Sequence, residues 1–446
     1  MKTFGQDISR EEAARQDVEA TRISRVSAWA LVVFFALIIT AIPVAQCLID
    51  IAEHMSDRRA TMLPDSLRIG ECIQEACTEM HAADVASLAD RAFLFNRLLN
   101  RNIRKYESGL EESSFLSELL IPPAQFVFSR VLRTGNEKVY TGRRGWLYYR
   151  DDVDYVTGRG FMEPSVQKMR RNSDGGMPEA VEPDPFPAII EFRDFLRARG
   201  IDLLLLPVPV KPSVHPEYLG RKAEKTGQIP NNSSFEQFLE RAKAQGIECV
   251  SLHGLMASMK SQSDVPLYLK TDTHWSPETM TAVAKHVAGV IKGRCGPAEA
   301  GRYSVAKAEV YNQGDTARMH NMPAWALKEE KEMAVVDIVL SSDGRSVWRS
   351  DRNSPVLVLG DSFANIYSMP SLGWGKSAGL TEHISLHLGL PVDRILRNDD
   401  GAFASREMLW TELKADKDRL KSTRIVIWEF SERELMNGNW KRLMLK

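Results

Sequence analysis

The most pronounced hydrophobic pattern in the chain is a long apolar run near the N-terminus. No charged residue occurs between Arg25 and Asp50, and about 20 apolar residues are enough to cross the hydrocarbon core of a bilayer. Basic residues precede the run and acidic residues follow it, an asymmetry that places the N-terminus in the cytoplasm. We therefore predict an uncleaved transmembrane anchor at residues 26–49. A cleaved secretory signal is the alternative, which is disfavoured because the run starts late and no clear small-x-small site follows it directly.

The pattern changes twice between this run and the middle of the chain. Residues 50–134 show mainly helical periodicity and are predicted to form a membrane-proximal lead-in. Residues 137–152, EKVYTGRRGWLYYRDD, contain two β-rich runs around a turn at 143–145, which predicts a β-hairpin. Residues 157–187 are rich in glycine, proline and charge, with Asp174-Gly175-Gly176 among them, and are predicted to form a long loop.

From residue 188 onward, helical and strand patterns alternate. Such alternation predicts a mostly parallel sheet with helices on both faces, and therefore an α/β fold. Neither a dinucleotide-binding glycine pattern nor a phosphate-binding loop of the Walker type occurs. The predicted helices are 188–200, 235–246 and a helix that runs to about residue 292, and the predicted strands are 201–210, 247–252, 265–270, 354–360, 392–397 and 423–430.

Composition narrows the choice of partners. The 446-residue chain is 43% hydrophobic and 26% charged, a normal globular balance, and its formal net charge of -1 gives no general attraction to nucleic acid. One of the five cysteines, Cys47, lies in the apolar run. The other four permit two disulfides in an oxidising compartment, with buried free thiols as the alternative, and their scattered spacing argues against a metal site.

A candidate nucleophile follows the predicted strand 354–360. The strand runs directly into DSFANIYS, and a serine at a sharp strand-to-helix turn is exposed at the carboxyl end of the sheet. The backbone N–H groups that begin a helix can stabilise an oxyanion. Ser362 is therefore a candidate nucleophile. The alternative is that Asp361 or Ser362 only caps the helix.

A candidate base lies in the stretch DTHWSPETM, residues 272–280. SPETM has the features of an ordinary helix start, with a serine cap and a proline in the first turn. Asp272 and His274 are not needed for that start. In an extended segment their side chains point the same way, so the carboxylate can orient the imidazole as serine chemistry requires. Packing is the alternative, and a metal site lacks convincing further ligands.

Four segments together resemble the alginate O-acetyltransferase family. They are GWLYYRDD at 145–152, DTHW at 272–275, GDSF at 360–363 and IVIWEFSERE at 425–434, in the family's order. The resemblance covers about residues 135–446 and implies a periplasmic SGNH-hydrolase-like domain that acetylates exopolysaccharides. Ordinary SGNH hydrolases have GDS near the start and D-x-x-H near the end, whereas this family places D-x-H-W before the serine, as here.

This resemblance implies roles for three residues. Ser362 would be the nucleophile, His274 the general base and acid, and Asp272 the orienting carboxylate. An acetyl group would pass through acetyl-Ser362 to a sugar hydroxyl, with no cofactor and no metal.

Four further residues are candidates for substrate binding. Trp275 would stack on a sugar ring, with a buried packing role as the alternative. Lys211 resembles a recurring family lysine, and the alternative is a solvated loop lysine. Arg433 would contact substrate, unless it forms a salt bridge with Glu429 or Glu432. Asn365 would donate to the oxyanion.

The predicted organisation is a cytoplasmic tail at 1–25, the anchor at 26–49, the helical lead-in at 50–134 and an SGNH-like acetyltransferase domain at 135–446. It implies a single-pass inner-membrane protein with its catalytic domain in the periplasm. The resemblance implies as partners a polysaccharide acceptor, a membrane-bound O-acyltransferase that supplies acetyl groups, and other exopolysaccharide-synthesis proteins. A carbohydrate acetylesterase with the same triad and a non-catalytic glycan-binding scaffold are the alternatives.

Overall fold

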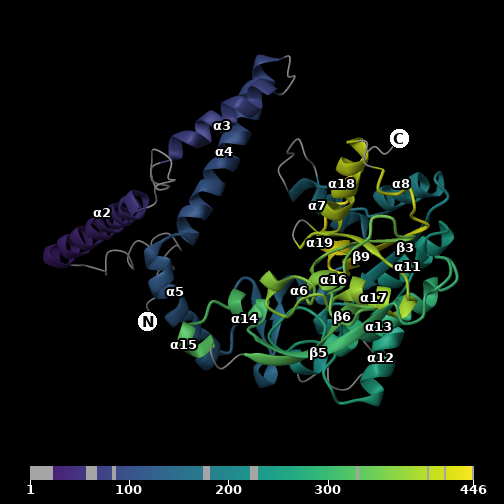
Figure 1. Cartoon of the computed structure of the whole chain (residues 1–446). Coiled ribbons are helices and arrows are strands. Elements are labelled where there is room, and N and C mark those ends of the chain that lie inside the picture. Colours follow the sequence, from purple (N-terminus) through teal and green to yellow (C-terminus); the bar gives the residue numbers. More distant parts are fainter. Residues whose placement is uncertain are drawn as a thin grey trace, which may run out of the picture. The chain divides into compact units, whose positions relative to one another are not determined.

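The computed structural model describes residues 24–56, 68–82, 87–173, 181–220, 230–327, 331–398, 401–415 and 418–443. The chain divides into two compact units, Met1–Leu120 and Ile121–Lys446 (Figure 1). The division falls earlier than the boundary at residue 134 that the periodicity suggests.

The described part of the first unit is helical. Helix α2, Arg25–Ser56, contains the whole apolar run, and its Arg25–Ala52 portion is long and apolar enough to cross a membrane. Helices α3, Ile69–Ala82, and α4, Leu88–Glu112, follow. Helix α5, Phe115–Val127, crosses the division between the units and continues into the π-helix η2, Phe128–Leu132.

The second unit is built around a five-stranded parallel sheet with the order β4-β3-β9-β7-β8. The prediction of a mostly parallel sheet with helices on both faces is confirmed. The strands are β3 Asp202–Val208, β4 Glu248–Cys249, β7 Val356–Gly360, β8 Asp393–Leu396 and β9 Ile425–Ser431.

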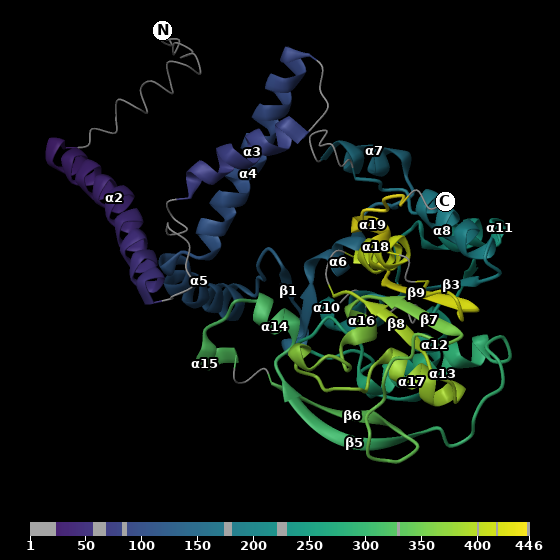
Figure 2. The same cartoon turned by 45° about the horizontal axis from the view of Figure 1, so that its top comes forward.

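Side chains that alternate along the strands form two separate cores. Leu204 and Leu206 of β3 point to one face of the sheet, and Leu203 and Leu205 point to the other. Three helices pack on the first face: α12 His253–Gln262, α13 Pro277–Ile291 and α17 Leu380–Leu388 (Figure 2). The second face is covered by α8 Phe186–Arg197, α11 Phe235–Ala244 and α18 Gly401–Lys414.

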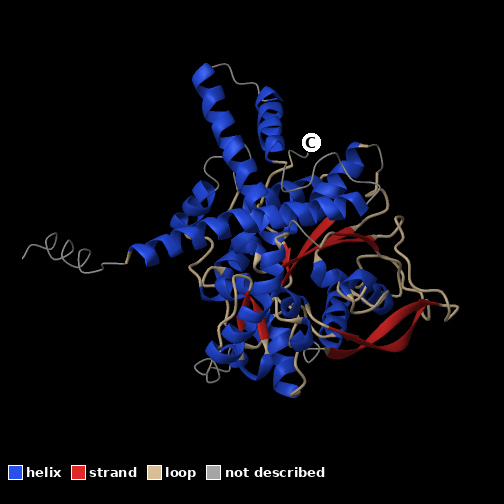
Figure 3. Cartoon of the chain, turned by 90° about the vertical axis from the view of Figure 1, so that its left-hand side faces the viewer, coloured by secondary structure: helices blue, strands red, loops and turns tan. Residues whose placement is uncertain are grey.

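Two antiparallel hairpins lie outside this sheet. The predicted hairpin is present as β1 Val139–Thr141 and β2 Leu147–Tyr149, joined through the 3-10 turn η3 Arg143–Gly145. The second hairpin, β5 Tyr303–Asn312 with β6 Glu332–Ser341, was not predicted (Figure 3). The short helices are α6 Arg150–Thr157, α9 Lys211–Val214, α10 Pro216–Leu219, α14 Asp315–Met319, α15 Ala324–Leu327, α16 Ser362–Asn365, η6 Pro370–Leu372 and α19 Glu434–Asn437.

The predicted strand at 265–270 is wrong. Only Tyr268 pairs, in an isolated bridge to Trp275. The segment folds back on itself, because the Leu269 N–H donates to the His274 carbonyl and the Ser276 N–H donates to the Leu267 carbonyl. Other backbone groups of the segment bind side chains, since the Leu267 N–H donates to His215 and the Lys270 N–H to Glu332. The segment therefore satisfies its backbone outside the sheet and does not join it.

The predicted loop also needs correction. Residues 157–187 contain helix α7, Pro164–Ser173, which begins at a proline as helices often do. Asp174-Gly175-Gly176 lies outside the described residues.

The two alternatives for the cysteines were disulfides and buried free thiols. All five cysteines are free thiols; Cys72 and Cys295 are buried, and the other three are partly exposed.

The sheet core should tolerate truncation poorly at Trp428. This side chain of the central strand β9 is fully buried and packs edge-on against Phe192, with ring centroids 5.5 Å apart. Trp428→Ala is expected to destabilise the second unit by about 3–5 kcal/mol, because large core truncations leave a cavity. The midpoint of urea unfolding followed by circular dichroism measures this. The matched control is Met333→Ala at an exposed position of β6, and equal midpoints for the two variants would contradict the packing described.

Candidate active site

The turn between β7 and α16 presents Ser362. Strand β7 ends at Gly360, and the Asp361 carboxylate caps α16 by accepting a hydrogen bond from the Phe363 N–H at 2.8 Å. A Cβ atom at position 360 would lie 2.6 Å from the Glu429 carboxyl, so a larger residue there would have to displace this buried side chain. The turn places Ser362 at the carboxyl end of the sheet, where open α/β folds form their sites.

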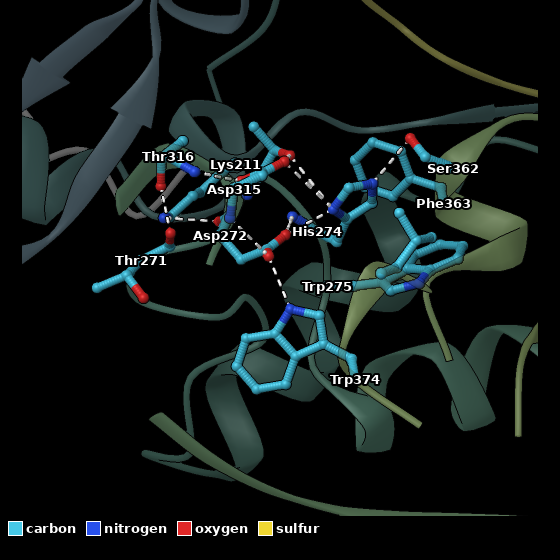
Figure 4. Close-up of polar contacts among 12 residues, drawn as sticks. Lys211, Thr271, Asp272, His274, Trp275, Asp315, Thr316, Ser362, Phe363 and Trp374 are labelled. Atoms are coloured by element: carbon cyan, nitrogen blue, oxygen red, sulfur yellow. Dashed lines mark hydrogen bonds and ion pairs between the residues drawn. The ribbon is translucent and has the colours of Figure 1, made fainter. Parts of the chain in front are cut away.

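Ser362, His274 and Asp272 form one hydrogen-bonded chain (Figure 4). His274 Nε2 lies 2.8 Å from Ser362 Oγ, and His274 Nδ1 lies 2.6 Å from Asp272 Oδ1. With Nδ1 protonated towards the carboxylate, Nε2 is free to accept the serine proton. An arrangement of this kind can activate a serine hydroxyl for attack on an ester carbonyl.

The Asp272 carboxylate is fully buried and is held by three further donors. Oδ1 also accepts from the His274 backbone N–H at 3.1 Å, and Oδ2 accepts from Trp374 Nε1 at 2.8 Å and from the Asp315 N–H at 3.0 Å. Burial alone would raise the pKa of Asp272, but the charge of His274 and these hydrogen bonds lower it overall. In turn burial lowers the pKa of His274, but Asp272 outweighs this and raises it.

Asp315 is a second acid beside the imidazole, and it was not predicted. Its Oδ2 lies 3.6 Å from His274 Nδ1 and accepts from the Thr273 hydroxyl, while Oδ1 accepts from the Thr273 N–H at 2.7 Å. Asp315 lies 40 residues after Trp275 and 47 residues before Ser362, so no motif near a predicted site residue pointed to it. Gly314 brings it close: a Cβ atom there would clash with the Thr271 carbonyl.

Asp272, His274 and Asp315 place one ligand atom each within 4.8 Å of one another, which resembles a metal-binding group. However, the acidic oxygens already accept hydrogen bonds from Trp374, from backbone N–H groups and from Thr273. These donors occupy the directions that a metal ion would need. The donor set fits a carboxylate that orients a histidine better than it fits a metal site.

Lys211 is neither the substrate contact nor the solvated loop lysine considered from the sequence. It is fully buried, and its ammonium group donates to three backbone carbonyls, those of Leu147, Lys270 and Asp272. It also lies 5.1 Å from the ring centroid of Trp146. Burial lowers the pKa of Lys211 to about 8 against the opposing effect of nearby acids. Its position under the 270–272 backbone indicates a positioning role.

A buried pair of acids lies beneath the nucleophile turn. Glu429 of β9 is 1% exposed, and one of its oxygens accepts from the Asp361 N–H at 3.0 Å. Its other oxygen has no hydrogen-bond partner among the described residues. Burial and the neighbouring Asp361 raise the pKa of Glu429 well above its usual value. Through its hydrogen bond with the Asp361 N–H, the buried Glu429 carboxyl holds the backbone of the turn that carries Ser362.

Arg433 does not pair with Glu429 or Glu432. Its guanidinium donates to Asp152 at 2.9 Å and lies 5.9 Å from the ring centroid of Phe363, next to the nucleophile. Glu432 instead contacts His253 at 2.6 Å. Arg433 therefore forms a salt bridge, but with Asp152 and not with the acids that the sequence suggested. It also lies close to the turn that carries Ser362.

The other two candidate substrate contacts lie in packed surroundings. Trp275 is fully buried and packs edge-on against Phe363, with ring centroids 5.3 Å apart, so this placement fits the packing alternative (Figure 4). The Asn365 amide donates to Asn398 at 2.9 Å and is 8% exposed. Its NH₂ group therefore already has a partner other than an oxyanion.

Comparisons with known proteins agree on one family. A family model described as SGNH hydrolase-like domain, acetyltransferase AlgX, matches residues 139–432. The probable alginate O-acetylase AlgJ of Pseudomonas fluorescens is 27% identical over 321 residues, which cover 70% of this chain and 71% of that protein. The protein of the same description from Pseudomonas putida is 24% identical over 320 residues, covering 70% and 73%.

A solved structure is also similar. The O-acetyltransferase domain of Pseudomonas putida AlgJ matches with a TM-score of 0.49 and 20% identity, covering 68% of this chain and 93% of that one. The family model spans well over half of the chain, and its SGNH-like α/β class is the one predicted. The chain belongs to the family of SGNH hydrolase-like acetyltransferase domains that includes AlgX.

Proposed function

We propose that this protein transfers acetyl groups to hydroxyls of an exported polysaccharide through an acetylated Ser362. The observation that carries the proposal is the hydrogen-bonded chain from Ser362 through His274 to Asp272, in a member of an acetyltransferase family. The names of the relatives, alginate O-acetylases, support a polysaccharide as the acceptor.

The first half-reaction forms the acyl-enzyme. His274 Nε2 takes the Ser362 proton while Oγ attacks the carbonyl carbon of the acetyl donor. The resulting oxyanion is held by the backbone N–H of Ser362, because the Phe363 N–H already donates to the Asp361 carboxylate. The intermediate then collapses, the bond to the leaving group breaks, and His274 returns the proton to that leaving group.

The second half-reaction reverses these roles. A sugar hydroxyl gives its proton to His274 and attacks the acetyl carbonyl of acetyl-Ser362. Oγ leaves and regains the proton from His274, so the free serine is restored and a sugar acetate is released. Asp272 stays ionised throughout and stabilises the imidazolium that forms in both steps.

We propose the cellular setting on the same basis. The apolar helix Arg25–Ala52 serves as the membrane anchor and holds the catalytic unit on the periplasmic side. Acetyl groups arrive from a membrane-bound O-acyltransferase, and other exopolysaccharide-synthesis proteins deliver the polymer.

Ser362→Ala and His274→Ala should reduce acetylation of the exported polymer to background. Either change removes a group that the covalent route requires, and losses of about a millionfold are typical for such residues. Colorimetric or NMR measurement of polymer acetyl content in strains with normal protein levels tests this. Unchanged acetylation would support a scaffold role instead. Release of free acetate with no transfer to added oligosaccharide would support an esterase.

The two acids beside His274 should differ sharply on amidation. Asp272→Asn replaces the acceptor at 2.6 Å and favours the wrong imidazole tautomer, so the transfer rate should fall about ten-thousandfold. Asp315→Asn keeps a side chain that can accept from Thr273 and lies farther from the ring, so a loss of about tenfold is expected. Initial rates on a small acetyl ester measure both. Equal losses would mean that the acids share the orienting role.

Lys211 should impose an alkaline limit on activity. Below about pH 8 its ammonium can serve all three carbonyls, and above this pKa the neutral amine can donate only two hydrogen bonds. Four nearby acids oppose the loss of the proton from Lys211, because their charges raise its pKa: Glu332, Asp272, Asp315 and Asp152. We expect kcat/KM to rise with pH as His274 loses its proton, above the usual histidine range, and to fall again above about pH 8.

Lys211→Met tests this assignment. The variant should lose about 10–100-fold in kcat with little change in KM, because a buried hydrogen-bonded charge is removed from behind the acid–base segment. Its remaining activity should lack the alkaline fall. Lys376→Met, at an exposed position, is the matched control and should match the wild type. If kcat/KM of Lys211→Met still falls above about pH 8, a group other than Lys211 causes the fall.

A further inference from the structure

The second helix that is apolar enough for a membrane presents its apolar side outward. In the stretch Ile121–Leu132, which belongs to the catalytic unit, the exposed apolar positions follow helical spacing. Val131 is 71% exposed, and Trp325 of the neighbouring α15 is 62% exposed. The exposed apolar residues of this surface are Ile121, Val127, Phe128, Val131, Leu132 and Trp325.

The polar side of the same stretch faces the catalytic unit. Gln125 is buried and donates to Ser129 at 3.0 Å, and the Ser129 hydroxyl lies 2.7 Å from His320 Nε2 at the end of α14. Phe126 packs against Trp325, with ring centroids 4.6 Å apart, and α15 lies beside this end of α5 in both views (Figures 1 and 2). A helix on a soluble surface has the opposite orientation, with its apolar stripe inward.

These contacts exclude a second membrane crossing by this stretch. A spanning helix must leave the folded unit and satisfy its polar groups within the bilayer. Here the Ser129 hydroxyl is hydrogen-bonded to His320, which belongs to the folded unit. An apolar face that is fixed to a folded unit fits a helix that lies in the plane of the membrane interface.

A cluster of arginines lies at the end of the apolar face. A pocket of about 480 Å³ is lined by Arg130 and Arg133 from the end of the stretch and by Arg143 and Arg144 from the η3 turn, and no acidic residue lines it. This local charge contrasts with the net charge of -1 of the whole chain. Guanidinium groups bind phosphate through paired hydrogen bonds.

Two of these arginines reach the pocket from the ends of turns. Arg133 is the left-handed C-cap residue that ends η2, with a φ of 54°, and its N–H donates to the Phe128 carbonyl. Arg144, with a φ of 56°, lies in the η3 turn of the hairpin. Both residues line the same pocket.

We propose that the apolar face of Ile121–Leu132, Trp325 and the arginine pocket dock the catalytic unit on an anionic bilayer, with lipid phosphates in the pocket. The apolar side chains enter the interface, Trp325 lies at headgroup level and the arginines bind the headgroups. A bilayer is the partner proposed because the same chain carries the apolar helix Arg25–Ala52, the membrane anchor of the proposed function. Docking of this kind would hold the acetyl-accepting serine near the membrane instead of at the end of a free tether.

The test measures the depth of single labels in the full-length chain in lipid nanodiscs. All five cysteines are first replaced by serine, and hydrolysis of a small acetyl ester confirms that this background folds. A bimane label is then attached at Val131→Cys and, as the control, at Val305→Cys on β5, which is also exposed. The nanodiscs contain phosphatidylcholine with or without phosphatidylglycerol, and brominated lipids quench labels that enter the bilayer.

We expect bromine near the headgroups to quench the label at 131, and to quench it more strongly when the nanodiscs contain phosphatidylglycerol. The label at 305 should not be quenched. Arg133→Gln with Arg144→Gln should lower the ratio of docked to undocked protein about 30-fold, the factor that two arginines near an anionic surface supply. Arg345→Gln with Arg352→Gln, two exposed arginines outside the pocket, should change nothing.

Three results would overturn the proposal. A label at 131 that is quenched no more than the label at 305 would show that the face is in water or covered by protein. Strongest quenching by bromine at the bilayer centre would show a second crossing. Unchanged lipid docking in the Arg133/Arg144 variant, with loss of binding to an anionic oligosaccharide, would assign the pocket to a glycan. Hydrolysis of the acetyl ester by each variant measures the activity of Ser362, so a failure of the proposed function can be told apart from a failure of docking.

Discussion

The buried carboxylate of Asp272 is the interaction on which the rest of the site depends. It has no contact with water and accepts hydrogen bonds from the imidazole, two backbone N–H groups and the indole of Trp374. A buried carboxylate that lost one of these donors would be destabilised by about 1–3 kcal/mol. The donors come from segments far apart in the chain, so the ionised acid fixes their mutual positions. The geometry of His274 follows from this arrangement.

Charge compensation around Asp272 extends into a second layer. Lys211 donates to the backbone carbonyl of Asp272, and the buried Glu429 carboxyl accepts from the Asp361 N–H in the turn that carries Ser362. Neither group needs to touch a substrate. Each removes freedom from a backbone segment that bears a reacting group, which is how a site is kept in its productive geometry before substrate arrives.

The sequence predicted the parts of this structure that local patterns encode. The strands of the parallel sheet and helices α8, α11 and α13 follow from apolar periodicity, and GDSF identified Ser362 because strand ends carry sites in α/β folds. DTHW identified Asp272 and His274 because their two-residue spacing puts both side chains on one side of an extended segment. Asp315, Trp374 and Glu429 were missed because only the tertiary fold brings them to the site. The strand predicted at 265–270 failed because its backbone closes on itself. The burial of Lys211 likewise depends on packing that no short pattern specifies, whereas the burial of Trp275 is the packing alternative that the sequence allowed.

The central claim is that Ser362 carries the acetyl group during transfer. The most direct measurement is mass spectrometry of the protein quenched during turnover with a small acetyl ester and no acceptor. The account predicts the mass of one added acetyl group on the peptide that contains Ser362, and its disappearance when an oligosaccharide acceptor is added. Acetyl transfer to the oligosaccharide with no acetylated Ser362 at any time point, under quench conditions that preserve a serine ester, would contradict it.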